Sequence, residues 1–325
     1  MYRHAQELCT ATWNVAGINN NPFEYWVTYP DPAYNQFMQA VEQLVSNTDE
    51  DLMVNSIFTE SMFLELLEEM KHQNIPNLEN VSELWASDFS RRKAVEGFLK
   101  DKSIGDKRLA SMPDRITNTI NCADGRTLRR PTVINSYCDS RLPSFQIWWE
   151  KWRHFLFRTH VQVFSRDDSK SQGQLVCSLI RPILRNKYPA ITAFEQAMSV
   201  PLQILCLAIL DAIFIHIVHR VAPDTWEDIR STLSNALIFG KDDRVCNIIA
   251  TSYADTPVFF LQEATAALVC KLVEHPELSD RYALLMPSDF DGKRDQNSVI
   301  LLDRRRFDTG SCIDVTQQVR AHKPY

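Results

Sequence analysis

Hydrophobic and polar positions follow a short-period pattern at both ends of this chain. Near the beginning, "ELCTATWNV" is rich in residues that favour strands, and residues 7–15 are predicted to form a short β-strand that ends near Asn14. Near the other end, "PVFFLQEA" predicts a buried strand, and a helix is expected over residues 264–274, before Pro276. The segments "RYALLMP" and "QNSVILLDRRRF" are two further strand candidates. This succession of strands and helices predicts a layered α/β sandwich.

The middle of the chain has a helical period instead. In "SFQIWWEKWRHFLF" the side chains of Trp148, Trp152 and Phe155 recur at helical spacing, which predicts a helix with one buried face. Residues 190–220 and 224–238 show similar patterns, as do "PAYNQFMQAVEQLV", "FTESMFLELLEEMKHQ" and "DFSRRKAVEGFLKDK". We therefore expect this part of the chain to be almost wholly α-helical.

The two patterns divide the chain into two parts. We expect an α/β fold in which a partial four-layer sandwich, residues 1–26 and 241–325, is interrupted by a large α-helical insertion, residues 27–240. Such an insertion is tolerable because the entropic cost of closing a loop grows slowly with its length. The longest apolar run, residues 200–222, contains Asp211 and other polar residues, so we expect a buried helix and no membrane span.

Composition and charge narrow the functional classes only slightly. Hydrophobic residues make up 45% and charged residues 23% of the 325 positions, which is typical of a globular protein. The formal net charge of −6 gives no general bias towards nucleic acid, although it leaves room for a local basic groove. The eight cysteines form no CxxC pair, and we expect buried free thiols, including Cys206, Cys246 and Cys270. With no apolar leader near Met1, the expected location is intracellular, cytoplasmic or nuclear.

Two predicted strands end on polar side chains that suit a metal site. Glu263 follows an apolar strand, and side chains at the ends of such strands line clefts in layered α/β folds. A carboxylate near an amide such as Asn14 provides the oxygen ligands that Mg²⁺ prefers. The alternatives are that Asn14 is a turn residue and that Glu263 is a solvated residue at the start of a helix.

The segments "TATWNVAG" and "PVFFLQEA" together resemble the first two motifs of the endonuclease/exonuclease/phosphatase superfamily of metal-dependent phosphohydrolases. The resemblance implies that Asn14 orients the scissile phosphate or a metal-bound water, and that Glu263 binds Mg²⁺. A third segment, "RDQNSVILLDRRRF", resembles the following strand of deadenylase-like members. Asn297 in this segment is a weaker candidate for substrate binding, and its alternative is a turn residue.

The resemblance implies Mg²⁺-dependent hydrolysis of a phosphodiester or phosphomonoester by a nuclease or phosphatase. The partner would be nucleic acid or a phosphorylated small molecule, with RNA slightly favoured.

Two features of the sequence depart from the family. Asn14 and Glu263 are 263 − 14 = 249 residues apart, whereas family members place these motifs much closer together.

The second departure is that the family's GDxN and SDH motifs, which supply an Asp–Asn and an Asp–His pair, do not occur in the sequence. We therefore expect this chain, as a truncated or degenerate homologue, to hydrolyse phosphodiesters negligibly. The alternative is a non-catalytic helical interaction module that carries a degenerate nuclease-like edge and binds an unknown protein partner.

Three other groups of residues have a chemical and a structural interpretation. The aromatic and basic stretch at residues 145–160 suits base stacking, but its periodicity favours a core helix. His216 and His219 near Asp211 resemble a ligand set, but buried, hydrogen-bonded histidines are the preferred interpretation. The arginines at 304–306 are expected to lie closer to the proposed cleft than the other basic patches, "RRKAVEGFLKDK" and "DGRTLRRP".

Overall fold

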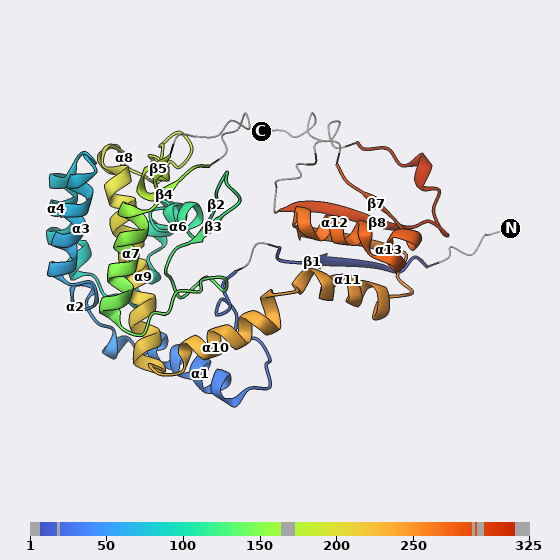
Figure 1. The fold of residues 1–325 in the computed structure, drawn as a ribbon, viewed down its shortest axis with the longest axis horizontal. Helices are drawn as coiled ribbons and strands as arrows, with labels where there is room; N and C mark the ends of the chain where they lie inside the picture. Colours follow the sequence, from blue (N-terminus) through green and yellow to red (C-terminus); the bar gives the residue numbers. More distant parts are fainter. Residues whose placement is uncertain (1–6, 18–19, 164–172, 288–289, 291–295, 316–325) are drawn as a thin grey trace. The chain divides into compact units, whose positions relative to one another are not determined.

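The computed structural model describes residues 7–17, 20–163, 173–287, 290 and 296–315. The fold is mixed α/β, and the chain separates into two compact units (Figure 1). Unit 1 comprises Met1–Asn20 and Asn235–Tyr325, and unit 2 comprises Asn21–Ser234. The expected boundaries, at residues 26/27 and 240/241, lie a few positions away from these.

Unit 1 is built on a mixed β-sheet. Its elements are β1 (Thr10–Asn14), α11 (Lys241–Thr251), β6 (Val258–Ala264), α12 (Ala266–Glu274), α13 (Pro276–Arg281), β7 (Tyr282–Leu285), β8 (Asn297–Asp303) and the 3₁₀-helix η6 (Thr309–Ser311). The strands lie in the order β1-β6-β8-β7, with β1 parallel to β6 and the other neighbours antiparallel. The strands and helices that the sequence predicts in this part of the chain are therefore present, with shorter bounds for β1.

Side chains alternate between the two faces of this sheet, and the apolar face is buried under helices. Phe259 and Leu261 of β6 point into a core that also contains Val299 and Leu301 of β8. Residues of α11, α12 and α13 complete that core: Val245, Cys246, Ile249, Leu268, Val269, Leu272 and Leu278. On the other face Phe260 is 40% exposed, as the two-residue period of a strand requires. The described part of unit 1 is thus one sheet with a helical layer, and a four-layer sandwich stays a prediction.

Unit 2 is mostly helical (Figure 1). Its first half contains α1 (Pro32–Ser46), η1 (Thr48–Glu50), α2 (Val54–Ile57), α3 (Glu60–His72), α4 (Leu78–Ser87), η2 (Phe89–Arg91), η3 (Val95–Leu99), α5 (Lys102–Asp106) and α6 (Ser111–Thr117). Its second half contains β2 (Thr119–Asn121), β3 (Thr127–Arg129), α7 (Phe145–Arg158), β4 (His160–Val161), β5 (Gln174–Leu175), η4 (Val176–Leu179), α8 (Ala193–Ala197), α9 (Ser199–Val221) and α10 (Trp226–Leu233). The π-helical turn η5 (Ser234–Ile238) follows α10. The ribbons β2–β3 and β4–β5 were not expected, because strands of two or three residues carry almost no periodic signal.

Two helices, the apolar α9 and the amphipathic α7, lie at the core of unit 2. α9 is long and apolar enough to cross a membrane, but 78% of its most apolar window is buried inside the folded chain. This confirms the expected buried helix. α7 buries Trp148, Trp152 and Phe155, which confirms its predicted core face, and the Trp149 and Trp152 rings stack with centroids 5.4 Å apart.

Asp211 interrupts the apolar run of α9 because it is the centre of a buried polar network. Its carboxylate accepts hydrogen bonds from Arg130 Nε at 2.7 Å, Thr132 Oγ1 at 2.7 Å and Trp152 Nε1 at 2.8 Å. Burial alone would lower the pKa of Arg130, but the carboxylates of Asp211 and Asp114 outweigh it and hold that pKa above its usual value. A buried carboxylate is tolerated only with such a complete set of donors.

The histidines of α9 do not join Asp211 in a ligand set. His219 Nε2 lies 2.9 Å from the carbonyl oxygen of Leu142, and burial lowers the pKa of the half-buried His216. The preferred interpretation of buried, hydrogen-bonded histidines therefore holds in part for His219, which is hydrogen-bonded and half-buried.

The cysteines are all free thiols, as the sequence predicts. Cys206 and Cys246 are buried, together with Cys122, Cys138 and Cys177. Cys270 was expected to be buried but is exposed on α12, because it lies on the face of that helix away from Val269 and Leu272.

Candidate functional site

The parallel pairing of β1 with β6 brings two distant segments of the sequence together. Asn14, the last residue of β1, lies opposite Gln262 of β6 in the strand register. Beyond the strand, Val15 N donates to Gln262 O at 3.0 Å and Gly17 N donates to Glu263 O at 2.9 Å. Asn14 and Glu263 therefore lie on adjoining strands at the same edge of the sheet, despite their separation in sequence.

Asn14 is exposed and organises the turn that follows β1. Its side-chain Oδ1 accepts a hydrogen bond from Ala16 N at 2.9 Å. This local contact is typical of an asparagine that ends a strand, and it fixes the direction of the side chain. Ala16 then adopts a left-handed backbone with φ of 49°. The turn-residue interpretation is thus correct for the oxygen of Asn14, and a role in phosphate binding stays a prediction.

Glu263 occupies a β-bulge. Leu261 pairs with Val299, and Ala264 pairs with Asn297, so β6 has one residue more than β8 over this interval. Glu263 itself has φ of 54°, in the left-handed region that non-glycine residues rarely adopt. Such a conformation costs about 1–2 kcal/mol. Bulges re-aim side chains, and strained residues of this kind cluster at functional sites.

Lys241 is a residue of this site that sequence reasoning missed. It is the first residue of α11, and its Nζ donates to Ala16 O at 2.6 Å. A cation at a helix N-terminus is disfavoured by the helix dipole, so the contact with the β1 turn explains its position. Burial lowers the pKa of Lys241, while the negative charges of Asp242 and Glu263 oppose that shift. The available signal was the segment "GKDD", which puts a lysine at the start of a helix that precedes an apolar strand.

Asn297 lies beside the bulge and is buried. Its Nδ2 donates to the carbonyl oxygen of Ala264 at 3.2 Å, and the two residues are partners in the β6–β8 register. This hydrogen bond joins β8 to the residue that follows the bulge, so Asn297 stabilises the bulge. Contact with a substrate stays a prediction for this residue.

The arginines at 304–306 lie at the wrong end of the sheet for this site. β8 runs antiparallel to β6, so Asn297 is next to Ala264 whereas Leu302 pairs with Val258. The arginines follow the end of β8 and are therefore remote from Glu263. The expectation that they lie closer to the cleft than the other basic patches stays a prediction, and the direction of β8 places them at the opposite end of the sheet from Glu263.

This site offers one carboxylate to a magnesium ion, and magnesium binding stays a prediction. Within the described ranges, no group of three or more His, Cys, Asp or Glu side chains gathers to hold a metal. Mg²⁺ retains several waters and often takes only one or two protein carboxylates, with substrate oxygens completing its shell. Glu263 would supply one such carboxylate, and Lys241, whose pKa is lowered by burial and raised by the charge of Glu263, would supply a positive charge for a phosphate.

A comparison with protein families identifies the helical unit. A family profile for a domain of unknown function, DUF8234, matches residues 51–231, more than half of the chain. The chain belongs to the DUF8234 family. No curated protein and no solved structure matches the chain. The DUF8234 region lies wholly within unit 2, so the residues around Asn14 and Glu263 are outside it.

Proposed function

We propose that unit 1 carries a Mg²⁺-dependent phosphoester-hydrolase site of the endonuclease/exonuclease/phosphatase type. On this proposal the DUF8234 unit is a helical insertion in the loop after β1. The observation that supports the proposal is the parallel β1–β6 pairing, in which Asn14 is the register partner of Gln262, the residue before the strained Glu263. These are the two positions to which the sequence resemblance assigns phosphate orientation and metal binding.

The residues of the site would have separate roles in metal binding and in phosphate orientation. Glu263 would hold Mg²⁺ through its carboxylate, and the bound ion would polarise a phosphate. Asn14 would orient the phosphate, and the ammonium group of Lys241 would offset its negative charge. The substrate class is a phosphodiester or phosphomonoester, with RNA favoured by the deadenylase-like β8 segment. The described residues offer positioning and charge without an Asp–His pair, so we expect low turnover.

Metal binding by the full chain tests this proposal directly. Mn²⁺ serves as a spectroscopic substitute for Mg²⁺, and electron paramagnetic resonance measures the free ion. We expect Glu263→Gln to weaken Mn²⁺ binding at least tenfold, because it removes the only carboxylate assigned to the ion. Glu274→Gln is the matched control, since Glu274 is exposed on α12 and should leave binding unchanged.

Hydrolysis gives a second measurement. A short RNA should be cleaved slowly in Mg²⁺ by the full chain, and Glu263→Gln should abolish that cleavage. Equal Mn²⁺ binding by the wild-type chain and Glu263→Gln would exclude Glu263 as the ligand. Turnover that is insensitive to Glu263 would exclude the site itself.

The second candidate function is a helical interaction module without catalysis. The observation that favours it is that the DUF8234 match covers unit 2 alone, and that unit 2 has its own core. On this alternative the β1–β6 edge binds no metal. A full chain that binds no Mn²⁺ at millimolar concentration would therefore favour the interaction module over the hydrolase.

A further inference from the structure

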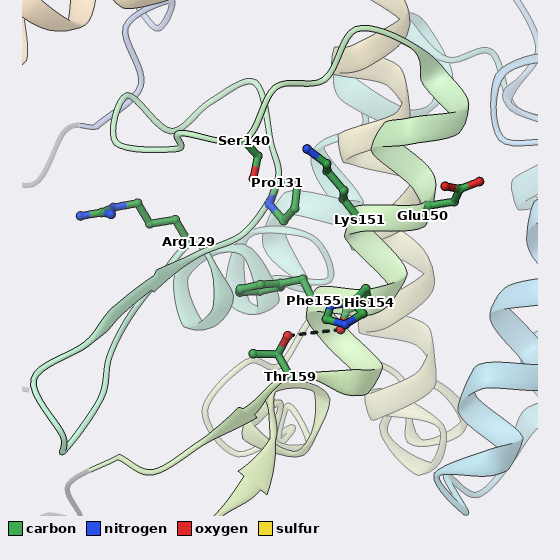
Figure 2. Close-up of a pocket in the computed structure, with 8 residues that line it drawn as sticks. All are labelled: Arg129, Pro131, Ser140, Glu150, Lys151, His154, Phe155 and Thr159. Atoms are coloured by element: carbon green, nitrogen blue, oxygen red, sulfur yellow. Dashed lines mark hydrogen bonds between the residues drawn. The ribbon is translucent and has the colours of Figure 1, made fainter.

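A cavity of about 500 Å³ opens on the surface of unit 2 (Figure 2). Its walls come from β3, from the segment at residues 131–140 and from the outer face of α7. This volume lies in the range typical of small-molecule sites. The cavity is inside the DUF8234 region and has no part in the site proposed for unit 1.

The charged groups of the cavity are mainly cationic. Arg129 and Lys151 line it beside the imidazole of His154, and Glu150 is the one carboxylate among the lining residues. Figure 2 shows the Glu150 carboxylate pointing away from the other lining side chains, and its Oε1 accepts from Gln146 Nε2 at 2.8 Å. The cavity therefore presents positive charge on a protein whose formal net charge is −6.

Arg129 and Lys151 differ from the basic residues around them. Among the described residues, neither forms a salt bridge with a carboxylate, and Lys151 Nζ donates to the backbone carbonyl of Arg141 at 2.9 Å. Nearby arginines are paired: Arg126 with Asp124 at 2.7 Å, Arg141 with Glu227 at 3.2 Å and Arg158 with Glu69 at 2.6 Å. The cations that line the cavity are thus the ones whose charge is left for an incoming anion.

Arg129 also has an unsatisfied donor. Its Nε is withdrawn from solvent and has no hydrogen-bond partner, while its guanidinium carbon lies 5.6 Å from the centroid of the Tyr137 ring. Buried donors are normally satisfied, and exceptions call for an explanation such as a ligand. The ammonium group of Lys151 has three donors, and its contact with Arg141 uses one of them.

The inner wall of the cavity is apolar. Phe155 and Pro131 are both buried and line it, and Ser140 and Thr159 add hydroxyl groups. Figure 2 shows Lys151 reaching from α7 towards Ser140 and Pro131, with Phe155 one turn further along the helix. A flat apolar group could pack on Phe155 and Pro131 while an anionic group meets the cations at the rim.

We propose that this cavity binds a phosphate-bearing molecule with a flat apolar part, for which a mononucleotide is the fitting chemical class. Phosphate would accept hydrogen bonds from Lys151, and the base would pack against Phe155. Arg129, whose guanidinium Figure 2 shows extending away from Lys151, would add its positive charge at a distance. The mononucleotide can be free or form the end of a nucleic-acid strand. The chemistry of recognition is the same in both cases.

Isothermal titration calorimetry of the full chain with AMP tests the proposal. We expect AMP to bind and adenosine to bind at least tenfold more weakly, because adenosine lacks the phosphate. Lys151→Ala should weaken AMP binding about tenfold, which corresponds to about 1.4 kcal/mol. Arg129→Ala should weaken it less, because Arg129 acts through its charge alone. Arg126→Ala is the matched control, because Arg126 is exposed, is paired with Asp124 and does not line the cavity, so it should leave the affinity unchanged.

The exposed Lys151 keeps the test valid if Arg129→Ala disturbs the fold. Lys151→Arg should retain most of the affinity, since it preserves the charge. No AMP binding at millimolar concentration, equal affinities for AMP and adenosine, or an unchanged affinity in Lys151→Ala would each overturn the proposal. Competition of AMP with a 5′-phosphorylated oligoadenylate would assign the site to strand ends, and a lack of competition would assign it to free nucleotides.

Discussion

At the scale of single residues, Asp303 shows how neighbouring charges hold one carboxylate in its ionised form. The residue is 1% exposed at the end of β8. It accepts hydrogen bonds from Arg305 Nη2 at 2.8 Å and from Arg281 Nε at 2.9 Å. These contacts, with Arg305 contributing most, hold the pKa of Asp303 well below its usual range, although burial acts in the opposite direction.

The lowered pKa predicts an acid-sensitive unit 1. Because the folded-state pKa lies below the unfolded value near 3.9, Asp303 stabilises the fold above about pH 4. That stability is lost as the pH falls through the folded-state pKa. Asp303→Asn should lower the stability of unit 1 at pH 7 by about 1–3 kcal/mol, because the arginines lose a charged acceptor. Stability would be measured by hydrogen exchange of peptides from β7 and β8, with corrected intrinsic rates.

Asp280→Asn is the control for this experiment, because Asp280 is exposed on α13. The difference between Asp303→Asn and the wild-type chain should shrink as the pH falls below 4. A difference that stays constant down to pH 2 would show that the ionised form of Asp303 does not stabilise unit 1.

At the scale of elements, the bulge in β6 stores strain at the candidate metal ligand. Glu263 adopts its left-handed φ within a strand whose other residues pair regularly. Asn297 supports the bulge through Ala264 O, and Gly17 N donates to Glu263 O. The surrounding hydrogen bonds therefore impose a backbone conformation that Glu263 disfavours.

Glu263→Gly should stabilise unit 1 while removing metal binding. Glycine avoids the left-handed penalty of about 1–2 kcal/mol. It also gives up about 0.5–1 kcal/mol through the greater freedom of the unfolded chain. The net gain should be about 0.5–1 kcal/mol, measured by hydrogen exchange of the β6 peptide. Glu263→Val is the opposing variant and should destabilise unit 1, because a branched side chain fits a positive φ poorly. A loss of stability in Glu263→Gly would mean that contacts of the carboxylate outweigh the backbone strain.

At the scale of the whole molecule, unit 2 has the features of an independent domain. Its core is centred on α7 and α9, and the network of Asp211, Arg130, Thr132 and Trp152 lies entirely within it. The DUF8234 match also falls within its limits. The core and the hydrogen-bond network of unit 2 are made by residues of unit 2 and do not include the sheet of unit 1.

We expect residues 21–234 expressed alone to be soluble and to give a helical circular dichroism spectrum with a cooperative thermal transition. Asp211→Asn in the same fragment should destabilise it by about 1.5–3 kcal/mol, because the buried Arg130 would lose one of its two charged partners and keep only Asp114. The exposed Asp124→Asn serves as the control and should change the transition little. A random-coil spectrum of the unaltered fragment would show that unit 2 depends on unit 1.

The local pattern of the sequence determined much of the secondary structure. The periodicity around Trp148 and Trp152 predicted α7 and its buried face, and the apolar run at residues 200–222 predicted the buried α9. The strands that end near Asn14 and Glu263 were also predictable. Each of these features depends on neighbours within a few positions, and that is the range over which hydrophobic periodicity carries information.

Tertiary structure alone decided how those pieces meet. The partner of Asp211 is Arg130, 81 positions away, and no local pattern connects the two residues. No local pattern predicts the hydrogen bond from Lys241 to Ala16 O or the bulge that gives Glu263 its positive φ. The pairing of β8 with β6 likewise decides that residues 304–306 lie at the opposite end of the sheet from Glu263. These features depend on the path of the chain through space. Side chains of distant residues meet there only after the strands have paired and the helices have packed.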